Sequence, residues 1–176
     1  MNFSVIAAID KNRGLGKDGK LTWNLPGDLK HFQSVTTEVE RSGTLNAVIM
    51  GRTTWDSLPE KSKPLAKRLN VVLTRNKNFS VPEGVIIASS LDQALDSLSS
   101  IGEGVNKVFV IGGASVYTQA IQHPACDRIY LTEIDKVFDC DTFFPPVNPK
   151  LFIKVETSEP ITEQGISYSF VEYNHK

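Results

Sequence analysis

Short β-branched and apolar runs alternate with helix-compatible segments over most of the chain, and this alternation restricts the fold more than any other feature. The first five runs lie at residues 4–9, 46–50, 70–74, 85–88 and 107–111. Helix-compatible segments begin near Leu29, Thr53, Leu91 and Ser115. Several runs are continuously apolar, as interior strands covered on both faces are. The pattern predicts an α/β fold with a largely parallel central sheet.

Beyond about residue 122 the sequence contains only strands and loops. Three further runs lie at residues 128–134, 152–156 and 166–173, and the last alternates apolar and polar residues as an edge strand does. A chain of 176 residues that is 40% hydrophobic can bury one sizeable core. We therefore expect residues 1–176 to form a single α/β domain: a central mixed, mostly parallel eight-stranded sheet, about four flanking helices and an antiparallel C-terminal hairpin.

The charge balance argues against a polyanionic partner. The chain has 19 Lys and Arg against 20 Asp and Glu, a net charge of −1, so we expect a small-molecule partner and neither nucleic acid nor a membrane. No basic region precedes the first apolar run, and the apolar stretches are of strand length, so we expect no signal peptide and no membrane span. Cys126 and Cys140 suit free thiols in a reducing compartment, and the three histidines show no metal-ligand spacing.

The stretch GLGKDGKLTW, which begins at Gly14, matches one nucleotide-binding pattern and nearly matches another. Its glycines fit G-x-G-x-x-G, and it fits a P-loop except that Leu21 replaces the hydroxyl residue. Both patterns need a helix directly after the glycines, where free N–H groups hold phosphate. Pro26 indicates that the helix starts later. The stretch is therefore a long glycine-rich loop, and its Leu-Thr-Trp ending suggests that it lies over a pocket.

Asp28 is the acid beside this loop. It lies on the apolar helical stripe of Leu25, Leu29, Phe32 and Val35, which places a carboxylate against the core. Two interpretations stay open at this point. Asp28 is either a first-turn acid that complements the helix dipole, or a desolvated acid with a raised pKa, poised for a cationic or proton-exchanging ligand.

Five blocks of the sequence together resemble the dihydrofolate reductase family. They are IAAIDKNRGLGKDGKLTWNLPGDLKHF, VIMGRTTWDSLP, PLAKRLNVVLTR, VFVIGGASVYTQA and YLTEIDKVFDCDTFFP, in the family's order and over nearly the whole chain. The resemblance implies NADPH-dependent reduction of 7,8-dihydrofolate to 5,6,7,8-tetrahydrofolate, by hydride transfer from nicotinamide C4 to pterin C6 with water-mediated protonation of N5. It also implies a cytoplasmic monomer that binds dihydrofolate and antifolate-type small molecules.

By resemblance, Asp28 is the sole ionisable group of the pterin pocket and holds the pterin's amino and ring N–H groups. Thr132 bonds Asp28 and orients it, while Trp23 and the loop of Leu21 control the access of water. The glycine-rich loop then resembles a lid over nicotinamide and pterin, and its two phosphate patterns are accidents of glycine content. Thr22 stands where the family usually has proline, which bears on the stiffness of the lid.

The resemblance also divides the rest of the site between substrate and cofactor. The substrate side comprises Ile6, Val5, Phe32, Leu65, Arg68 and Ile111, with Arg68 gripping the α-carboxylate. The cofactor side comprises Ala7, Leu15, Gly16, Gly51, Arg52, Thr53, Thr54, Thr74, Arg75, Ser89, Gly112, Gly113, Ala114, Ser115, Val116 and Tyr117. Arg52 and Arg75 favour NADPH over NADH, Ser89 stands where many relatives have a further basic residue, and the Gly112-Gly113 peptide is expected to be cis.

Simpler interpretations stay open for several of these residues. Arg52 also fits a solvated surface charge, Ser90 a helix cap, and the Gly112-Gly113 pair a tight strand-to-helix turn. Two other functions stay open as well: a pyrimidine-type NADPH reductase of related architecture, against which the W-N-L-P-G-D block speaks, and a folate- or nucleotide-binding protein without catalysis. Because the chain ends at Lys176, without the thymidylate synthase domain that accompanies this reductase in some organisms, we expect it to act alone.

Overall fold

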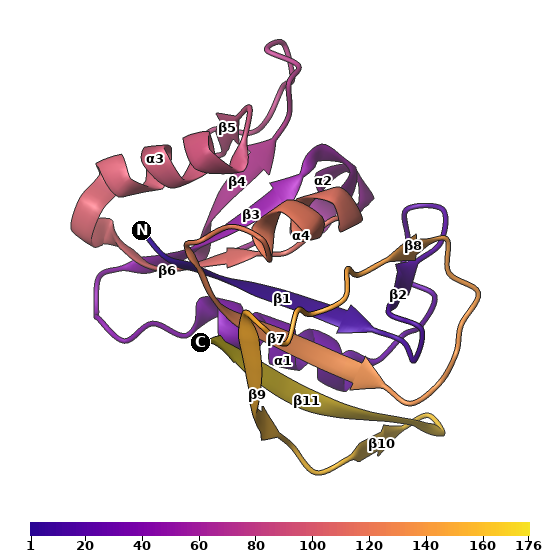
Figure 1. Cartoon of the computed structure of the whole chain (residues 1–176). Helices are drawn as coiled ribbons and strands as arrows, with labels where there is room; N and C mark the ends of the chain where they lie inside the picture. The colour runs from indigo at the N-terminus through magenta and orange to yellow at the C-terminus, as the bar shows by residue number, and fades with distance from the viewer.

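A nine-stranded sheet organises the computed structural model, which describes residues 1–176 (Figure 1). The strands lie in the order β10-β11-β7-β1-β6-β3-β4-β5, and β9 also pairs with β11. Neighbours from β7 to β5 are parallel, whereas β11 runs antiparallel to β7, β9 and β10. The strands are β1 Phe3–Ile9, β3 Leu45–Gly51, β4 Arg68–Leu73, β5 Ile86–Ala88, β6 Val105–Val110, β7 Cys126–Ile134, β9 Phe152–Thr157, β10 Ile161–Glu163 and β11 Ile166–His175.

All the runs expected as strands are strands, and the structure adds three short ones. β10 is the ninth strand of the sheet, while β2 (Gly14–Gly16) and β8 (Thr142–Phe143) form a separate antiparallel pair. The expectation that residues 166–173 form an edge strand was wrong, because β11 lies between β7 and the outer strands β9 and β10. Alternating polarity indicates that one face of a strand is solvated, and an interior antiparallel strand can share that property with an edge.

The four expected helices are present, two on each face of the sheet. They are α1 Pro26–Thr37, α2 Arg52–Ser57, α3 Leu91–Ile101 and α4 Ala114–Ala120, with short 3-10 turns at Glu60–Ser62 and Gly102–Gly104. Val5 of β1 packs in the core that contains the apolar residues of α3 and α4. Its neighbour Ile6 points to the other face, where it packs with Trp55 of α2 and with Phe32 of α1. No helix is both long enough and apolar enough to cross a membrane.

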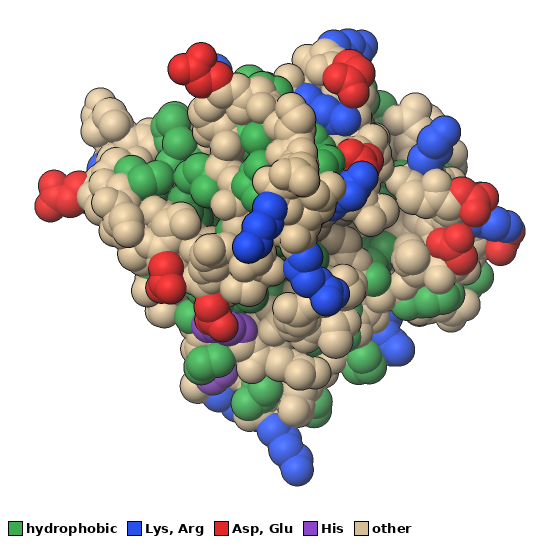
Figure 2. Space-filling view, turned by 90° about the horizontal axis from the view of Figure 1, so that it is seen from above, with side chains coloured by type: hydrophobic (Ala, Val, Ile, Leu, Met, Phe, Trp, Pro, Cys, Tyr) green, Lys and Arg blue, Asp and Glu red, His purple; other side chains and the backbone are tan.

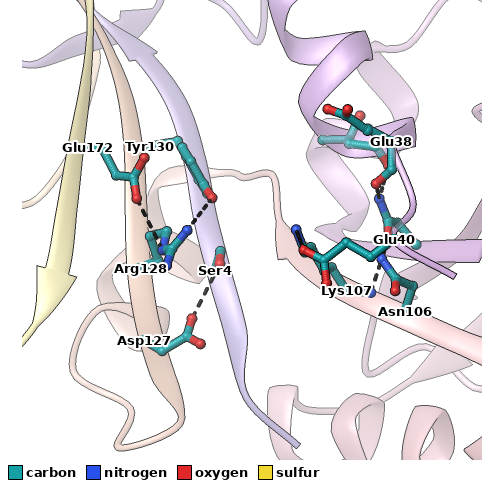
Figure 3. A network of polar contacts seen from close by, with 11 residues as sticks. Ser4, Glu38, Glu40, Asn106, Lys107, Asp127, Arg128, Tyr130 and Glu172 are labelled. Carbon is teal, nitrogen blue, oxygen red and sulfur yellow. Dashed lines mark hydrogen bonds and ion pairs between the residues drawn. The ribbon is translucent and has the colours of Figure 1, made fainter. Parts of the chain in front are cut away.

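A polar network fixes the far end of α1 to the sheet. The fully buried Asn46 donates hydrogen bonds to Thr36 O (3.0 Å) and Glu38 O (2.8 Å), and its Oδ1 accepts one from Lys107 N (3.0 Å). Figure 3 shows the neighbouring ion pair of Lys107 with Glu40, which measures 2.6 Å. Because the C-terminal end of α1 is tied to the starts of β3 and β6, its N-terminal end lies toward the carboxyl ends of these strands.

Candidate functional site

A cleft of about 840 Å³ opens at the carboxyl ends of the parallel strands. Its lining comes from the last residues of β1, from the segments that follow β3, β4, β5 and β6, from the first turns of α1 and from the glycine-rich loop. β1 pairs with β6 on one side and with β7 on the other. The chain continues from β1 to β3 on the β6 side, whereas it continues from β6 to β7 on the other side of β1, so the two connections lead in opposite directions along the sheet. Open α/β sheets bind their ligands at such a position, and the volume suits small organic molecules.

Asp28 lies in the wall of this cleft, in the first turn of α1. Its side chain is buried, and Thr132 Oγ1 of β7 donates a hydrogen bond of 2.6 Å to Asp28 Oδ1. Burial raises the pKa of Asp28, the bond from Thr132 lowers it, and the negative charge of Glu163 raises it further. The net direction is upward because desolvation is the largest cause. Asp28 therefore lies in the first turn of the helix and is also desolvated, so the structure has the feature named by each of the two interpretations left open by the sequence.

Asp28 is the only acid that lines the cleft, but other ionisable side chains line it too. His31, one helical turn further along α1, also lines the cleft. Its ring stacks on Phe170 of β11 with a centroid distance of 3.7 Å and an interplanar angle of 16°. Burial lowers the pKa of His31, which favours the neutral imidazole. The expectation that Asp28 is the sole ionisable group of a pterin pocket stays a prediction, and His31 is a second ionisable residue of the same helix that lines the cleft.

The residues expected on the substrate side divide into two groups. Ile6, Phe32, Leu65 and Ile111 line the cleft, whereas Val5 and Arg68 do not. Val5 is fully buried on the opposite face of β1, because successive side chains of a strand point to opposite sides.

Arg68 lies behind the apolar wall of the substrate side. Its Nη1 donates a hydrogen bond of 2.9 Å to Thr36 Oγ1, and its Nε donates one of 2.9 Å to Ala66 O. The guanidinium carbon lies 6.0 Å from the centre of the Phe32 ring. These contacts hold the guanidinium beside the cleft with part of its hydrogen-bonding capacity free.

All the residues expected on the cofactor side line the same cleft. Gly51 N donates a hydrogen bond of 2.9 Å to Gly112 O, which brings the start of α2 next to the start of α4. The Gly112-Gly113 peptide bond is cis, as expected from the resemblance. Gly112 has a φ of 130°, and a Cβ at this position would lie 3.2 Å from Thr54 Oγ1. The backbone conformation therefore favours glycine here, and a Cβ would also require Thr54 to shift slightly.

Two arginines and two serines line the cofactor side of the cleft: Arg52, Arg75, Ser89 and Ser90. Arg52 lies 3.5 Å from Asp56 and 4.8 Å from the centre of the Phe79 ring, so it is partly held in place. Ser90 caps α3 by accepting a hydrogen bond of 3.1 Å from Gln93 N, which confirms its interpretation as a helix cap. Ser90 also lines the cleft. Figure 2 shows several lysine and arginine side chains near the middle of the face seen from above, around a hollow.

The glycine-rich loop forms part of the cleft wall without any helix after its glycines. Gly14–Gly16 pairs with Thr142–Phe143 as β2 and β8, and Lys17 forms an ion pair with Asp139. The first helix after the loop begins at Pro26, which excludes both the dinucleotide fingerprint and the P-loop.

The end of the loop combines an exposed apolar residue with a buried one. Leu21 lines the cleft and is 54% exposed, whereas Trp23 is buried and does not line it. Trp23 packs against Phe138 at a ring distance of 5.3 Å, and its Nε1 has no hydrogen-bond partner. Between them Thr22 Oγ1 lies 3.5 Å from Cys140 Sγ, so a polar contact stands where the family's proline would have none.

Several residues that line the cleft were not predicted from the sequence. His31 and Leu29 follow Asp28 on the same helix, and the helical spacing of three residues could have identified His31. Thr142 could not have been found, because its place depends on the pairing of β8 with β2 across 126 residues of sequence. The remainder lie in the α2 region or beside predicted residues: Ala8, Gly19, Lys20, Ser57, Leu58, Pro59, Leu73, Ser90, Leu91 and Gln119.

Comparison with known proteins gives one consistent result. The sequence profile of the family described as "Dihydrofolate reductase" matches residues 2–175. A dihydrofolate reductase from Heliothis virescens is 42% identical over 180 residues, which cover 98% of this chain and 97% of the relative. The structure of Schistosoma mansoni dihydrofolate reductase superposes with a TM-score of 0.87 at 37% identity, covering 100% of this chain and 99% of the other.

Longer proteins contain a region that is equally similar. A bifunctional dihydrofolate reductase-thymidylate synthase from Arabidopsis thaliana is 45% identical over 175 residues, which cover 97% of this chain but 34% of that protein. The chain therefore spans about a third of the length of these plant relatives.

Proposed function

Because the chain belongs to the dihydrofolate reductase family, we propose that it catalyses the NADPH-dependent reduction of 7,8-dihydrofolate to 5,6,7,8-tetrahydrofolate. The observation that carries the proposal is the buried Asp28–Thr132 pair, which holds the only carboxylate that lines a cleft of about 840 Å³. A buried acid with a perturbed pKa in a large cleft marks a functional site.

In this proposal Asp28 binds the pterin. An ionised carboxylate can accept hydrogen bonds from an amino group and a ring N–H at the same time, which fixes the orientation of the ring. Its negative charge also favours the substrate as that becomes cationic, and the effect is strong because the surroundings exclude water. Thr132 uses one lone pair of Oδ1 and leaves the rest of the carboxylate for the ligand.

The substrate's other parts fit the remaining wall. Ile6, Phe32, Leu65 and Ile111 supply apolar contact for the aromatic rings. Arg68 then holds the α-carboxylate, because a guanidinium with free N–H groups beside the cleft binds a carboxylate in a bidentate manner.

The residues of the cofactor side fit NADPH. Gly51, Gly112 and Gly113 leave backbone accessible at the junction of two helix starts, which suits a pyrophosphate. Arg52, Thr74, Arg75 and Ser89 provide charge and hydroxyl groups for a 2′-phosphate. When bound, NADPH supplies the hydride that pterin C6 receives.

The glycine-rich loop acts as a lid in this proposal. Leu21 covers the cleft from outside, and the buried Trp23 packs against Phe138 at the end of the same loop. Together they admit the single water that brings a proton to N5 and exclude the others, which strengthens the electrostatic effect of Asp28.

Replacement of Asp28 by asparagine tests the proposal. The unmodified protein should oxidise NADPH in the presence of dihydrofolate. Asp28→Asn should lose most of that activity at neutral pH, and its remaining rate should vary more steeply with pH in the acid range. Asp96→Asn, at an exposed position of α3, is the matched control and should behave like the unmodified protein. Tight NADPH binding without turnover of any pterin would contradict the proposal, and turnover of a pyrimidine alone would replace it by the related reductase activity.

A further inference from the structure

Helix α1 begins without a capping side chain of its own. Leu25 occupies the N-cap position and makes no side-chain cap, while Asp28 N and Leu29 N both donate to Leu25 O. Pro26 has no N–H group. The N–H of Gly27 is therefore the free donor at the start of the helix that carries Asp28.

Glu163 accepts this donor from a strand far away in the sequence. Its two carboxylate oxygens lie 3.1 and 3.2 Å from Gly27 N, and Tyr168 Oη donates a hydrogen bond of 3.3 Å to Oε1. A Cβ on Gly27 would lie 2.4 Å from Tyr168 Oη, so the cluster closes only around glycine. No lysine, arginine or histidine forms an ion pair with Glu163. A carboxylate is thus fixed at the start of α1 by donors that are formally neutral.

The position of Glu163 affects Asp28 directly. The N-terminus of a helix stabilises negative charge within its first turn, and here two carboxylates share that turn. The negative charge of Glu163 raises the pKa of Asp28, in addition to the larger effect of burial, and the bond from Thr132 opposes both.

The other groups around Asp28 carry no formal charge at neutral pH. Burial raises the pKa of Tyr168 on β11, and it raises the pKa of Tyr117 on α4, which also interacts with the charge of Asp28. Burial lowers the pKa of His31 on α1 itself, and the contact from β7 is the hydroxyl of Thr132. Glu163 on β10 is therefore the second formal charge beside the acid of the cleft.

We propose that Glu163 is a positioning residue for Asp28, which caps α1 and keeps a second negative charge beside the carboxylate that binds the pterin. The inference deepens the proposed function and rests on it for the identity of the ligand. Two negative charges favour a cationic pterin more than one does, so Glu163 extends the protonation of the bound substrate toward higher pH.

Replacement of Glu163 by glutamine separates the charge from the cap. Glu163→Gln keeps the length of the side chain and an oxygen that can accept from Gly27 N, but it removes the negative charge. Glu163→Asp keeps the charge on a shorter side chain. Glu159→Gln is the matched control, because Glu159 lies in the exposed loop before β10 and its side chain has no hydrogen bond or ion pair.

The first measurement is the carboxyl-carbon NMR titration of Asp28 in the ligand-free protein, which needs no turnover. We expect the titration midpoint of Asp28 to move to lower pH in Glu163→Gln, to return toward the original value in Glu163→Asp and to stay in place in Glu159→Gln. An unmoved midpoint in Glu163→Gln would overturn the inference. If only the thermal stability changed, equally in Glu163→Gln and Glu163→Asp, Glu163 would be a structural cap and nothing more.

The second measurement is the pH dependence of NADPH oxidation with dihydrofolate. We expect Glu163→Gln to lose more activity at neutral and alkaline pH than at acid pH, because the bound pterin loses its proton at lower pH. A uniform loss at every pH would contradict the role of the charge. If the NMR midpoint moves but no variant turns over dihydrofolate, the positioning role holds and the proposed function fails.

Discussion

Thr132 holds the carboxylate of Asp28 through one hydrogen bond, and Thr132→Val removes that bond with a side chain of similar shape. The bond measures 2.6 Å and Thr132 is buried, so no water replaces it easily. A hydrogen bond to a charged group contributes about 1.5–3 kcal/mol. If the whole free energy of this bond stabilises the transition state, its loss should lower kcat/KM by roughly 10- to 150-fold, since each 1.36 kcal/mol corresponds to about a factor of ten.

The pH dependence gives the sign of the effect. The bond from Thr132 lowers the pKa of Asp28 and so opposes the effect of burial. Loss of this bond should therefore raise the pKa of Asp28 further. The acid limb of the kcat/KM profile should then move to higher pH. A raised pKa in the folded state contributes stability that is present below the unfolded-state pKa of about 3.9 and is lost as pH rises through the folded-state pKa. Thr132→Val should therefore destabilise the protein more at neutral than at acid pH.

Steady-state NADPH oxidation across pH and urea unfolding at two pH values measure both effects. Thr132→Ser keeps the hydroxyl and serves as the control, which should retain the acid limb of the unmodified protein. A Thr132→Val protein whose kcat/KM falls less than about twofold and whose acid limb stays in place would refute the reasoning. It would mean that packing around α1 alone orients Asp28.

Three further predictions concern packing, capping and the cofactor. Gly27→Ala should lower the free energy of unfolding by about 1–3 kcal/mol, because its Cβ would meet Tyr168 Oη at 2.4 Å; an unchanged urea midpoint would show that Tyr168 yields freely. Ser90→Ala removes the acceptor of the 3.1 Å bond from Gln93 N and should cost about 1 kcal/mol in the same assay. Arg75→Ala should raise KM for NADPH and leave KM for NADH unchanged; an equal rise for both would exclude contact with the 2′-phosphate.

Local pattern predicted the fold well wherever one element dictates its own structure. The strand runs, the helix start at Pro26 and the end of strand–helix alternation near residue 122 follow from apolar periodicity and proline position. The short strands β2, β8 and β10 did not, because two or three residues carry too little pattern and pair through tertiary contacts. The interior place of β11 also depends on its neighbours, which a single strand's alternation does not encode.

The candidate site was predictable to the extent that its residues stand in quoted motifs. The residues that the family resemblance assigned to the cofactor all line the cleft, and the Gly112-Gly113 peptide is cis as expected. The resemblance did not separate Ile6 from Val5, which the alternation of β1 puts on opposite faces. Glu163 carries no motif at all, because its contact with Gly27 joins residues 136 apart and arises only when the β10–β11 turn folds against α1.

Isotope transfer tests the central claim most directly. The protein is incubated with dihydrofolate and with NADPH that carries deuterium at the transferred position of nicotinamide C4, and the pterin product is analysed by mass spectrometry and NMR. The proposed function predicts tetrahydrofolate with one deuterium at C6, formed at a rate that falls sharply in Asp28→Asn. Binding of both ligands without labelled tetrahydrofolate would contradict it.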